Sequence, residues 1–257
     1  MDFSTVVKSL RSIDIEQVRL DSPIGELWSV QQITSADQHL QPDILYLGRL
    51  SHLDRSISQP AGPINLLLLK DSTLPDSLLS IAGLNLALLP ESTILNDVYL
   101  RLQAVLLDSS RIVSGMGILL DALLEDKGLQ QLAAAAAQVF QMPVLITDSS
   151  FKYLAHARSG LGSPEFNELD VQSGYIADSL VQEIQERRID EQIRKAGKPV
   201  LIHSNRGDEY LVSSVSINHV EVAHISLLTG GRPVGGVERE MLRRFSQVVA
   251  TELQKNN

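Results

Sequence analysis

The fold of the first part of this chain is decided by the stretch INLLLL, residues Ile64–Leu69. Two further apolar runs, at residues 43–47 and 85–89, flank it at intervals of about twenty residues, a spacing typical of βα units. Strands that lack polar alternation and are joined by helices indicate a parallel sheet covered on both faces. Residues 1–96 are therefore expected to form a small α/β domain with a mainly parallel sheet.

Polar turn residues follow the second and third apolar runs. Ser72 or Thr73 is predicted to cap a helix whose first turn tolerates Pro75. Residues 90–93 repeat this pattern after the third run, and they predict a helix that begins near Ile94.

A long connecting helix is predicted for residues 97–126. Its apolar residues follow a heptad-like spacing, at Val98, Leu102, Val105, Ile112, Met116, Leu119 and Leu123. Gly115 and Gly117 each cost about 1 kcal/mol relative to Ala within a helix, so close packing or a kink is expected there. Two interpretations stay open, a helix packed on its own domain and a signalling helix that pairs with its counterpart in a dimer.

The second predicted domain covers residues 127–257. Its expected elements are a helix at 128–140, a hairpin of strands at 144–147 and 151–157, a polar helical section at 164–195, strands at 199–204, 210–217 and 220–229, and a terminal helix at 237–253. This order predicts an antiparallel sheet flanked by helices.

Composition narrows the function classes. The formal charge of −9 argues against a surface built for nucleic acid, because such affinity comes largely from clustered Lys and Arg. The chain has no cysteine, which excludes disulfides, thiolate nucleophiles and Cys-ligated zinc. The amino terminus lacks the pattern of a signal peptide, and no uninterrupted apolar run approaches the ~20 residues of a membrane span. A cytoplasmic protein without membrane contact is expected.

The second domain resembles a known sensor domain in several stretches. These are Leu129–Leu132, Pro143–Asp148, Gly174–Ile176, Arg188-Ile189, Val215–Ile217 and Ile225–Leu228. In them it is similar to the GAF-like domain of PucR-type (purine catabolism regulator) and related CdaR-type (sugar diacid regulator) transcription factors. The family has a Val-Gly pair before its last strand, where this chain has Val222-Ala223-His224. The stretch 41–48 likewise resembles the amino-terminal module of PucR-type regulators.

The resemblance implies the ligand-sensing and dimerising region of a bacterial transcription regulator that responds to a small metabolite. A homodimer is expected, with no enzymatic activity and no cofactor. In the family a carboxy-terminal helix-turn-helix follows and binds DNA, and this chain is expected to contact DNA only through such a module, which is missing after Asn257. The alternative is a stand-alone GAF-like binding or scaffold protein without DNA-binding output.

A small molecule is expected between the sheet of the second domain and its polar helical section, as GAF-type folds imply by resemblance. The candidate ligand-binding residues are His156, Arg158, Tyr175, His203, Ser214, Ser216 and His224. His224 is expected to share a strand face with Val220, Val222 and Leu228. Each histidine has the alternative of a structural role with satisfied hydrogen bonds.

A second candidate site lies in the first domain, at the carboxyl ends of its parallel strands. Arg49, Lys70 and Ser72 can hold a small anion beside a helix start. The alternative is that these are ordinary βα turns with solvated charges.

Neither a catalytic nor a metal site is predicted. The glycine-rich loop 229–236 lacks the lysine of a phosphate-binding loop. His219 and His224 are expected on opposite strand faces, which does not suit a shared metal ion.

Overall fold

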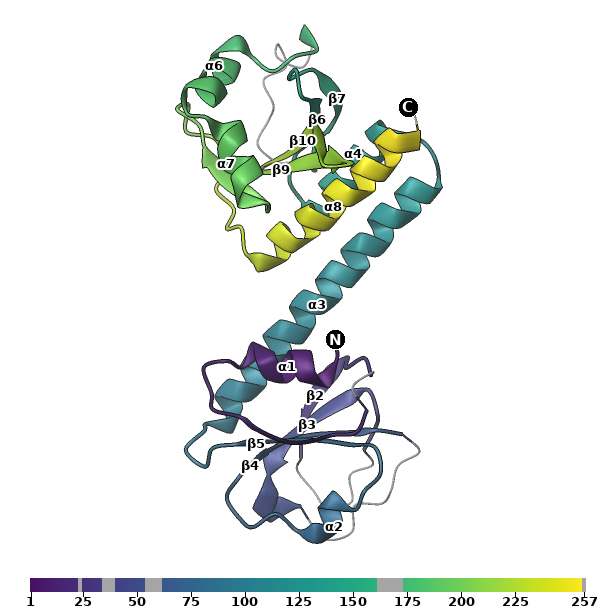
Figure 1. The fold of residues 1–257 in the computed structure, drawn as a ribbon, viewed down its shortest axis with the longest axis vertical. Coiled ribbons are helices and arrows are strands. Elements are labelled where there is room, and N and C mark those ends of the chain that lie inside the picture. Colours follow the sequence, from purple (N-terminus) through teal and green to yellow (C-terminus); the bar gives the residue numbers. More distant parts are fainter. Residues whose placement is uncertain (23–24, 34–39, 54–61, 161–172, 256–257) are drawn as a thin grey trace. The chain divides into compact units, whose positions relative to one another are not determined.

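The computed structural model describes residues 1–22, 25–33, 40–53, 62–160 and 173–255. They form two compact units, Met1–Ser110 and Arg111–Asn257 (Figure 1). Each unit holds one five-stranded sheet, so the chain is mixed α/β as predicted. The division falls within helix α3 (Leu95–Leu124), and each unit therefore includes part of that helix.

The first sheet has the strand order β1-β5-β4-β3-β2. Its strands are β1 (Glu16–Leu20), β2 (Ser29–Gln32), β3 (Ile44–Arg49), β4 (Ile64–Leu69) and β5 (Leu84–Leu89). The three predicted runs are the central strands, and they pair in parallel. Strand β2 extends the parallel set, whereas β1 is antiparallel to β5. The two edge strands were not predicted, because β2 buries a single residue and reads as polar.

Both faces of this sheet are covered, which confirms the sequence prediction. All six residues of β4 are buried. Leu67 and Leu69 pack with α1 (Phe3–Ser9) and the first half of α3, whereas Leu66 and Leu68 pack with α2 (Asp76–Leu79) and the short 3₁₀ helix η1 (Leu50–His52). Alternate side chains of an extended strand point to opposite faces, so one leucine-rich strand supplies both cores.

The start of α2 differs from the prediction. Pro75 is the N-cap residue, and no side chain caps the helix, so the predicted capping by Ser72 or Thr73 is wrong. A proline disfavours the helical conformation of the residue before it, so the helix cannot extend back before Pro75, and it begins at Asp76. Helix α3 begins at Leu95, next to the predicted Ile94.

The second sheet is antiparallel throughout, with the order β7-β6-β10-β9-β8. Its strands are β6 (Val144–Asp148), β7 (Tyr153–Ala157), β8 (Val200–His203), β9 (Glu209–Ile217) and β10 (Val220–Leu228), and its helices are α4 (Leu129–Phe140), α6 (Asp178–Glu186), α7 (Ile189–Ala196) and α8 (Gly236–Lys255). The predicted order of elements is confirmed. The predicted helical section 164–195 begins outside the described residues, and Gly174 within it adopts a left-handed φ of 78° outside α6 and α7.

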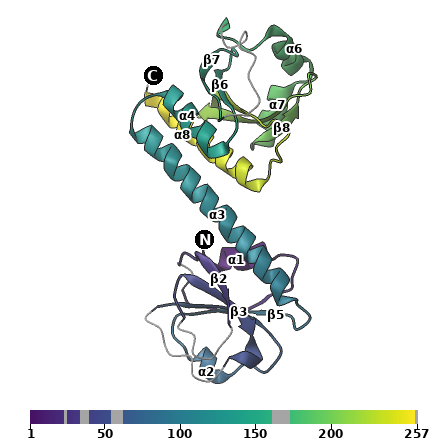
Figure 2. The ribbon, with the colours of Figure 1, turned by 180° about the vertical axis from the view of Figure 1, so that it is seen from behind.

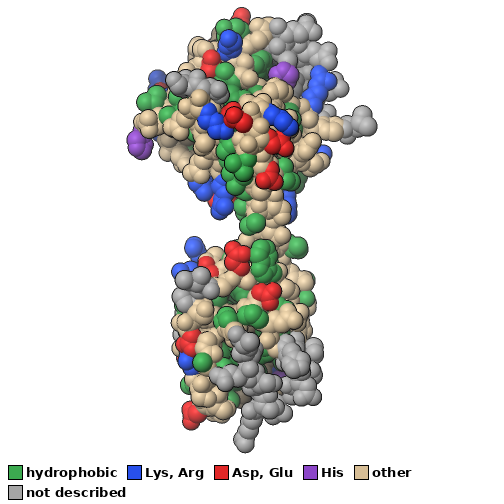
Figure 3. All heavy atoms as spheres, turned by 90° about the vertical axis from the view of Figure 1, so that its right-hand side faces the viewer, with side chains coloured by type: hydrophobic (Ala, Val, Ile, Leu, Met, Phe, Trp, Pro, Cys, Tyr) green, Lys and Arg blue, Asp and Glu red, His purple; other side chains and the backbone are tan. Residues whose placement is uncertain are grey.

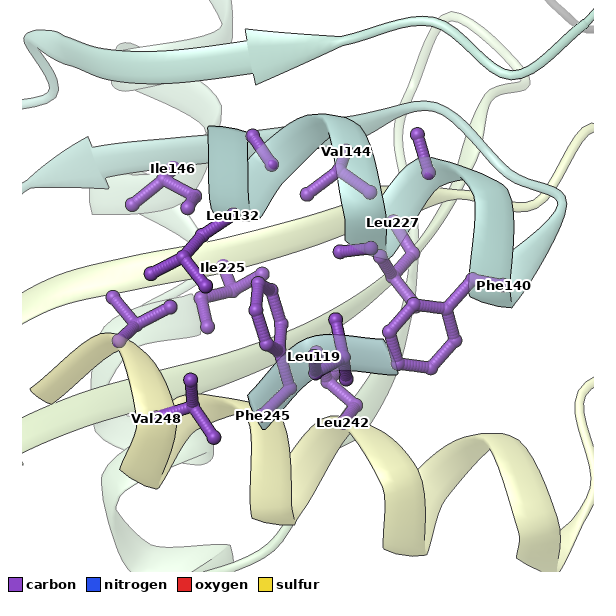
Figure 4. Close-up of a cluster of buried hydrophobic side chains, with 14 of the residues drawn as sticks. Leu119, Leu132, Phe140, Val144, Ile146, Ile225, Leu227, Leu242, Phe245 and Val248 are labelled. Carbon is purple, nitrogen blue, oxygen red and sulfur yellow. The ribbon is translucent and has the colours of Figure 1, made fainter. Parts of the chain in front are cut away.

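Different helices cover the two faces of this sheet (Figures 1 and 2). Helices α4 and α8 and the second half of α3 form the main core on one face (Figure 4). In that core the Phe140 and Phe245 rings meet at a centroid distance of 6.3 Å. Helices α6 and α7 cover the other face, where Ile189 and Ile193 pack near Val212.

Helix α3 packs on the core of the second unit through Gly115. A Cβ atom at this glycine would lie 2.9 Å from both Met241 Cε and Val139 Cγ1. The close approach predicted for Gly115 is therefore confirmed, whereas nothing lies within 4 Å of the corresponding position at Gly117. Among the described residues, α3 alone has the length and apolar composition of a membrane-spanning helix.

This contrast generates a stability prediction. Alanine at either glycine gains about 1 kcal/mol of helix propensity. At Gly115 the added methyl must also displace the short Val139 side chain, and such overpacking costs about 1–3 kcal/mol. We expect Gly117→Ala to raise the free energy of unfolding measured in urea. The free energy of unfolding of Gly115→Ala should be about 1–3 kcal/mol lower than that of Gly117→Ala. Equal free energies for the two variants would contradict the packing of α3 on α4 and α8.

Candidate functional site

A cavity of about 270 Å³ lies between the second sheet and helices α6 and α7. This is where the sequence analysis expected a small molecule. Its wall combines apolar side chains with a few polar ones. The apolar lining is Leu145, Phe151, Tyr153, Ile176, Leu180, Ile184, Ile189, Ile193, Ile202, Tyr210, Val212 and Leu228; the polar lining is Thr147, Glu183, Asp190, Ser204, Arg206, Asp208, His224 and Ser226.

Strand alternation explains why the sheet contributes these residues. Along β10, Ala223, Ile225 and Leu227 point into the core with α4 and α8. His224, Ser226 and Leu228 point to the opposite face and line the cavity. A sheet that packs tightly on one side thereby presents a partly polar surface on the other.

His224 is the most deeply buried polar residue of the cavity wall contributed by β10. It is 6% exposed, and its Nε2 atom has no hydrogen-bond partner among the described residues. Glu221 Oε1 lies 3.3 Å from this atom, within ion-pair range but without hydrogen-bond alignment. An unpaired buried polar atom costs about 1–3 kcal/mol, so a ligand that supplies its partner gains binding energy.

Asp190 lies in the first turn of α7 and lines the cavity with His224. Burial raises the pKa of the Asp190 carboxyl above its ordinary value of 3.8, and the carboxylate of Glu221 raises the pKa further. His224 and Arg194 act in the opposite direction. The wall near α7 and β10 therefore holds a carboxylate whose charge is incompletely compensated.

Glu183, by contrast, has its full set of partners. Its carboxylate accepts hydrogen bonds from Arg187 Nη1 at 2.5 Å and from the backbone N–H of Asn205 at 2.9 Å. Arg187 also donates to the carbonyl oxygen of His203 at 2.6 Å. These bonds hold α6 against the turn between β8 and β9, so Glu183 has a structural role in closing the cavity.

Of the predicted ligand-binding residues in the second unit, His224 lines this cavity. The prediction that it shares a face with Val222 is wrong, because a bulge between Glu221 and Ala223 shifts the alternation of β10. Ser214 and Ser216 lie on the same sheet but line a separate hollow with His219 and Arg194.

The other predicted residues lie outside the cavity wall. His203 is exposed, and its Nδ1 atom lies 3.2 Å from Glu209 Oε2. Tyr175 is half exposed, and its backbone forms an isolated antiparallel β-bridge with Lys152. The backbone of His156 pairs with the side chain of Gln130, and Arg158 is exposed at the end of β7.

The cations predicted to hold an anion in the first unit each contact a carboxylate. Arg49 Nη1 lies 3.5 Å from Asp71 Oδ2, and Lys70 Nζ lies 2.8 Å from Glu16 Oε2. Hydrogen bonds from Ser51 lower the pKa of Asp71, so this carboxylate remains charged beside Arg49. Ser72 is exposed in the turn after β4.

Sequence reasoning missed Asp190, Thr147 and Ser226. Asp190 was read as part of a polar helical section. A signal was present, because Ile189 and Ile193 are spaced one turn apart and mark the buried face of this short helix.

Comparison with known proteins finds similar solved structures but no matching family model and no matching curated protein. The chain is similar to the gliding protein MglB from Thermus thermophilus, with 16% identity and a TM-score of 0.32, over 58% of this chain and 92% of that one. A structure described as MglB with a tetrameric arrangement has 14% identity and a TM-score of 0.32, over 57% of this chain and 93% of its own. At these TM-scores neither likeness informs the function of this chain.

The raised pKa of Asp190 predicts a pH-dependent stability difference. Between pH 3.8 and the raised value the folded state binds more protons than the unfolded state, so stability falls as pH rises through this window. Asp190→Asn removes that titration. We therefore expect the melting temperature of Asp190→Asn, relative to the unmodified protein, to increase from pH 4 to pH 7.

Glu191→Gln is the matched control, since it neutralises a more exposed carboxylate on the same helix. A difference between Asp190→Asn and the unmodified protein that stays constant across the pH range would contradict the burial of Asp190.

Proposed function

We propose that this chain is the small-molecule-sensing and dimerising region of a bacterial, cytoplasmic transcription regulator, with its effector held in the cavity of the second unit. The observation that carries the proposal is a largely apolar cavity whose wall holds the buried Nε2 atom of His224, which has no hydrogen-bond partner among the described residues. Ligand sites commonly combine apolar walls with a few converging polar groups. The sequence resemblance to PucR-type regulators supports the same class. The proposed role is binding without catalysis.

We propose that the second sheet transmits effector binding in the cavity to the helices on its other face. Strand β10 contacts the cavity with His224 and Ser226, and it contacts the core around α8 with Ile225 and Leu227. An effector changes the output only if it binds two arrangements of the helices with different affinity. Helices α3 and α8 are the elements proposed to carry that difference to a downstream DNA-binding module.

The proposed dimer forms between two copies of the second half of α3. Val113, Leu120 and Leu124 are 54%, 46% and 80% exposed, and with Gly117 they follow a 4-3-4 spacing on one face of the helix. An apolar seam at this spacing suits a helix pair, and the open position at Gly117 permits close approach. On the face shown in Figure 3, side chains of both charge signs lie on the surface of the second unit.

The dimer prediction is tested with charges placed in the seam. Leu120→Glu combined with Leu124→Glu buries two carboxylates per copy in the proposed interface, and we expect at least a tenfold weaker dimer in sedimentation equilibrium. Leu107→Glu is the control, because Leu107 is 65% exposed and lies outside the seam. A monomer at all concentrations of the unmodified protein would contradict the dimer.

Effector binding is tested by thermal unfolding in the presence of purines, ureides, amino acids, amines and organic acids. A ligand at a hundred times its Kd stabilises the native state by about 2.7 kcal/mol. We expect one chemical class to raise the melting temperature, and Ser226→Leu, which fills the cavity, to abolish the rise. Ser216→Leu on the neighbouring strand, outside the cavity, should leave it intact. Equal responses of the two variants would exclude this cavity as the effector site.

A further inference from the structure

We infer that the cavity selects an organic cation, an amine or amidine on a compact apolar body, with its N–H groups bonded to Asp190 and His224. This inference rests on the proposed function and specifies the ligand of the same cavity. Two observations at the junction of α7 and β10 carry it. Nε2 of His224 is buried without a hydrogen-bond partner, with Glu221 Oε1 at 3.3 Å, and no described residue forms a hydrogen bond or ion pair with the side chain of Asp190.

The charges around this junction favour a cation. Glu221 has Arg194 at 3.6 Å, and Glu183 has Arg187 at 2.5 Å, so each of these carboxylates is paired. At the turn between β8 and β9, Arg206 and Asp208 contribute opposite charges to the lining, and Arg206 donates to Ser179. Within the described part of the chain, Asp190 is left as a carboxylate of this junction without an ion-pair partner.

A carboxylate or phosphate ligand would face repulsion from the same groups. Asp190 and Glu221 both act on His224, and an anion placed against His224 would lie near two negative charges. A neutral imidazole can accept one N–H bond at Nε2, and the Asp190 carboxylate can accept further ones. A protonated nitrogen satisfies both acceptors with charge-assisted bonds, which are stronger than neutral ones.

The rest of the cavity sets the size and polarity of the ligand body. Apolar side chains form the larger part of the wall, and most of these are isoleucine and leucine. The volume of about 270 Å³ lies just below the range of pockets that hold drug-sized ligands, about 300–1,000 Å³. A single ring or a short branched chain that carries one basic nitrogen fits this description.

The direction of pH dependence follows from the same groups. Burial raises the pKa of Asp190, so its carboxylate takes up a proton at a higher pH than an exposed aspartate does. Protonation of Asp190 removes the charge that attracts the cation. The affinity for an organic cation should therefore fall as pH decreases and Asp190 takes up its proton.

The test uses three probes that share one apolar body: benzylamine, benzyl alcohol and benzoate. Binding to the full chain is measured by calorimetry and by NMR titration at pH 7.5, where benzylamine is protonated. We expect benzylamine to bind more tightly than either other probe by about tenfold or more. Loss of a hydrogen bond to a charged group costs about 1.5–3 kcal/mol, so Asp190→Asn should weaken benzylamine by about tenfold or more.

Three controls keep the result interpretable. Glu191→Gln removes a carboxylate from the same helix outside the cavity and should leave the benzylamine affinity unchanged. Ser226→Leu should abolish binding of all three probes. Circular dichroism of Asp190→Asn should show an unchanged fold, so that weaker binding reports the lost charge.

The outcomes separate this inference from the proposed function. Benzoate or benzyl alcohol binding at least as tightly as benzylamine, with Ser226→Leu abolishing it, would overturn the cation class and support the cavity as a ligand site. Benzylamine affinity unchanged in Asp190→Asn would also overturn it. Binding of none of the three probes would overturn the inference at this size of ligand, while the wider thermal screen still decides the proposed function.

Discussion

The constraint on which the second unit depends is the alternation of side chains along β10, at the centre of its sheet. Ala223, Ile225 and Leu227 pack into the core with α4 and α8, and this burial is what holds the sheet to its helices. The same strand must then present His224 and Ser226 to the other face. That face meets two short helices, and the contact leaves a cavity with a buried polar atom in its wall. The alternation of side chains along β10 therefore produces both the core on one face of the sheet and the candidate site on the other.

In the first unit both faces of the sheet are covered in a different way. Its central strands are apolar on both faces, and helices or turns pack on each side. The buried polar groups there satisfy one another. Asn85 donates to Asn65 at 2.8 Å and to the carbonyl oxygen of Ser22, and Asn65 donates to the carbonyl oxygen of Pro42. This network ties β4 to β5 and to their flanking loops, so its amides have a structural role, whereas Nε2 of His224 in the second unit has no hydrogen-bond partner among the described residues.

Elements with a strong periodic pattern were predictable, and those without one were not. The leucine-rich strands, the long helix α3 and the alanine-rich helix α4 each bury a continuous face, and burial imposes the period that sequence analysis detects. Strands β1 and β2 lie at sheet edges, where half of the side chains meet solvent and the pattern is lost. The start of α2 was missed because Pro75 overrides the capping preference of the residues before it.

The sequence by itself determined the mixed α/β class, the three central strands of the first unit and the order of elements in the second, because each of these depends on local propensity and periodicity. The family resemblance predicted a small molecule between the second sheet and the polar helices, and a cavity lies there. The tertiary structure decided which side chains face that region. A bulge reverses the alternation within β10, and α7, distant in the sequence, brings Asp190 to His224. Such juxtapositions arise from register and helix docking, which no local pattern encodes.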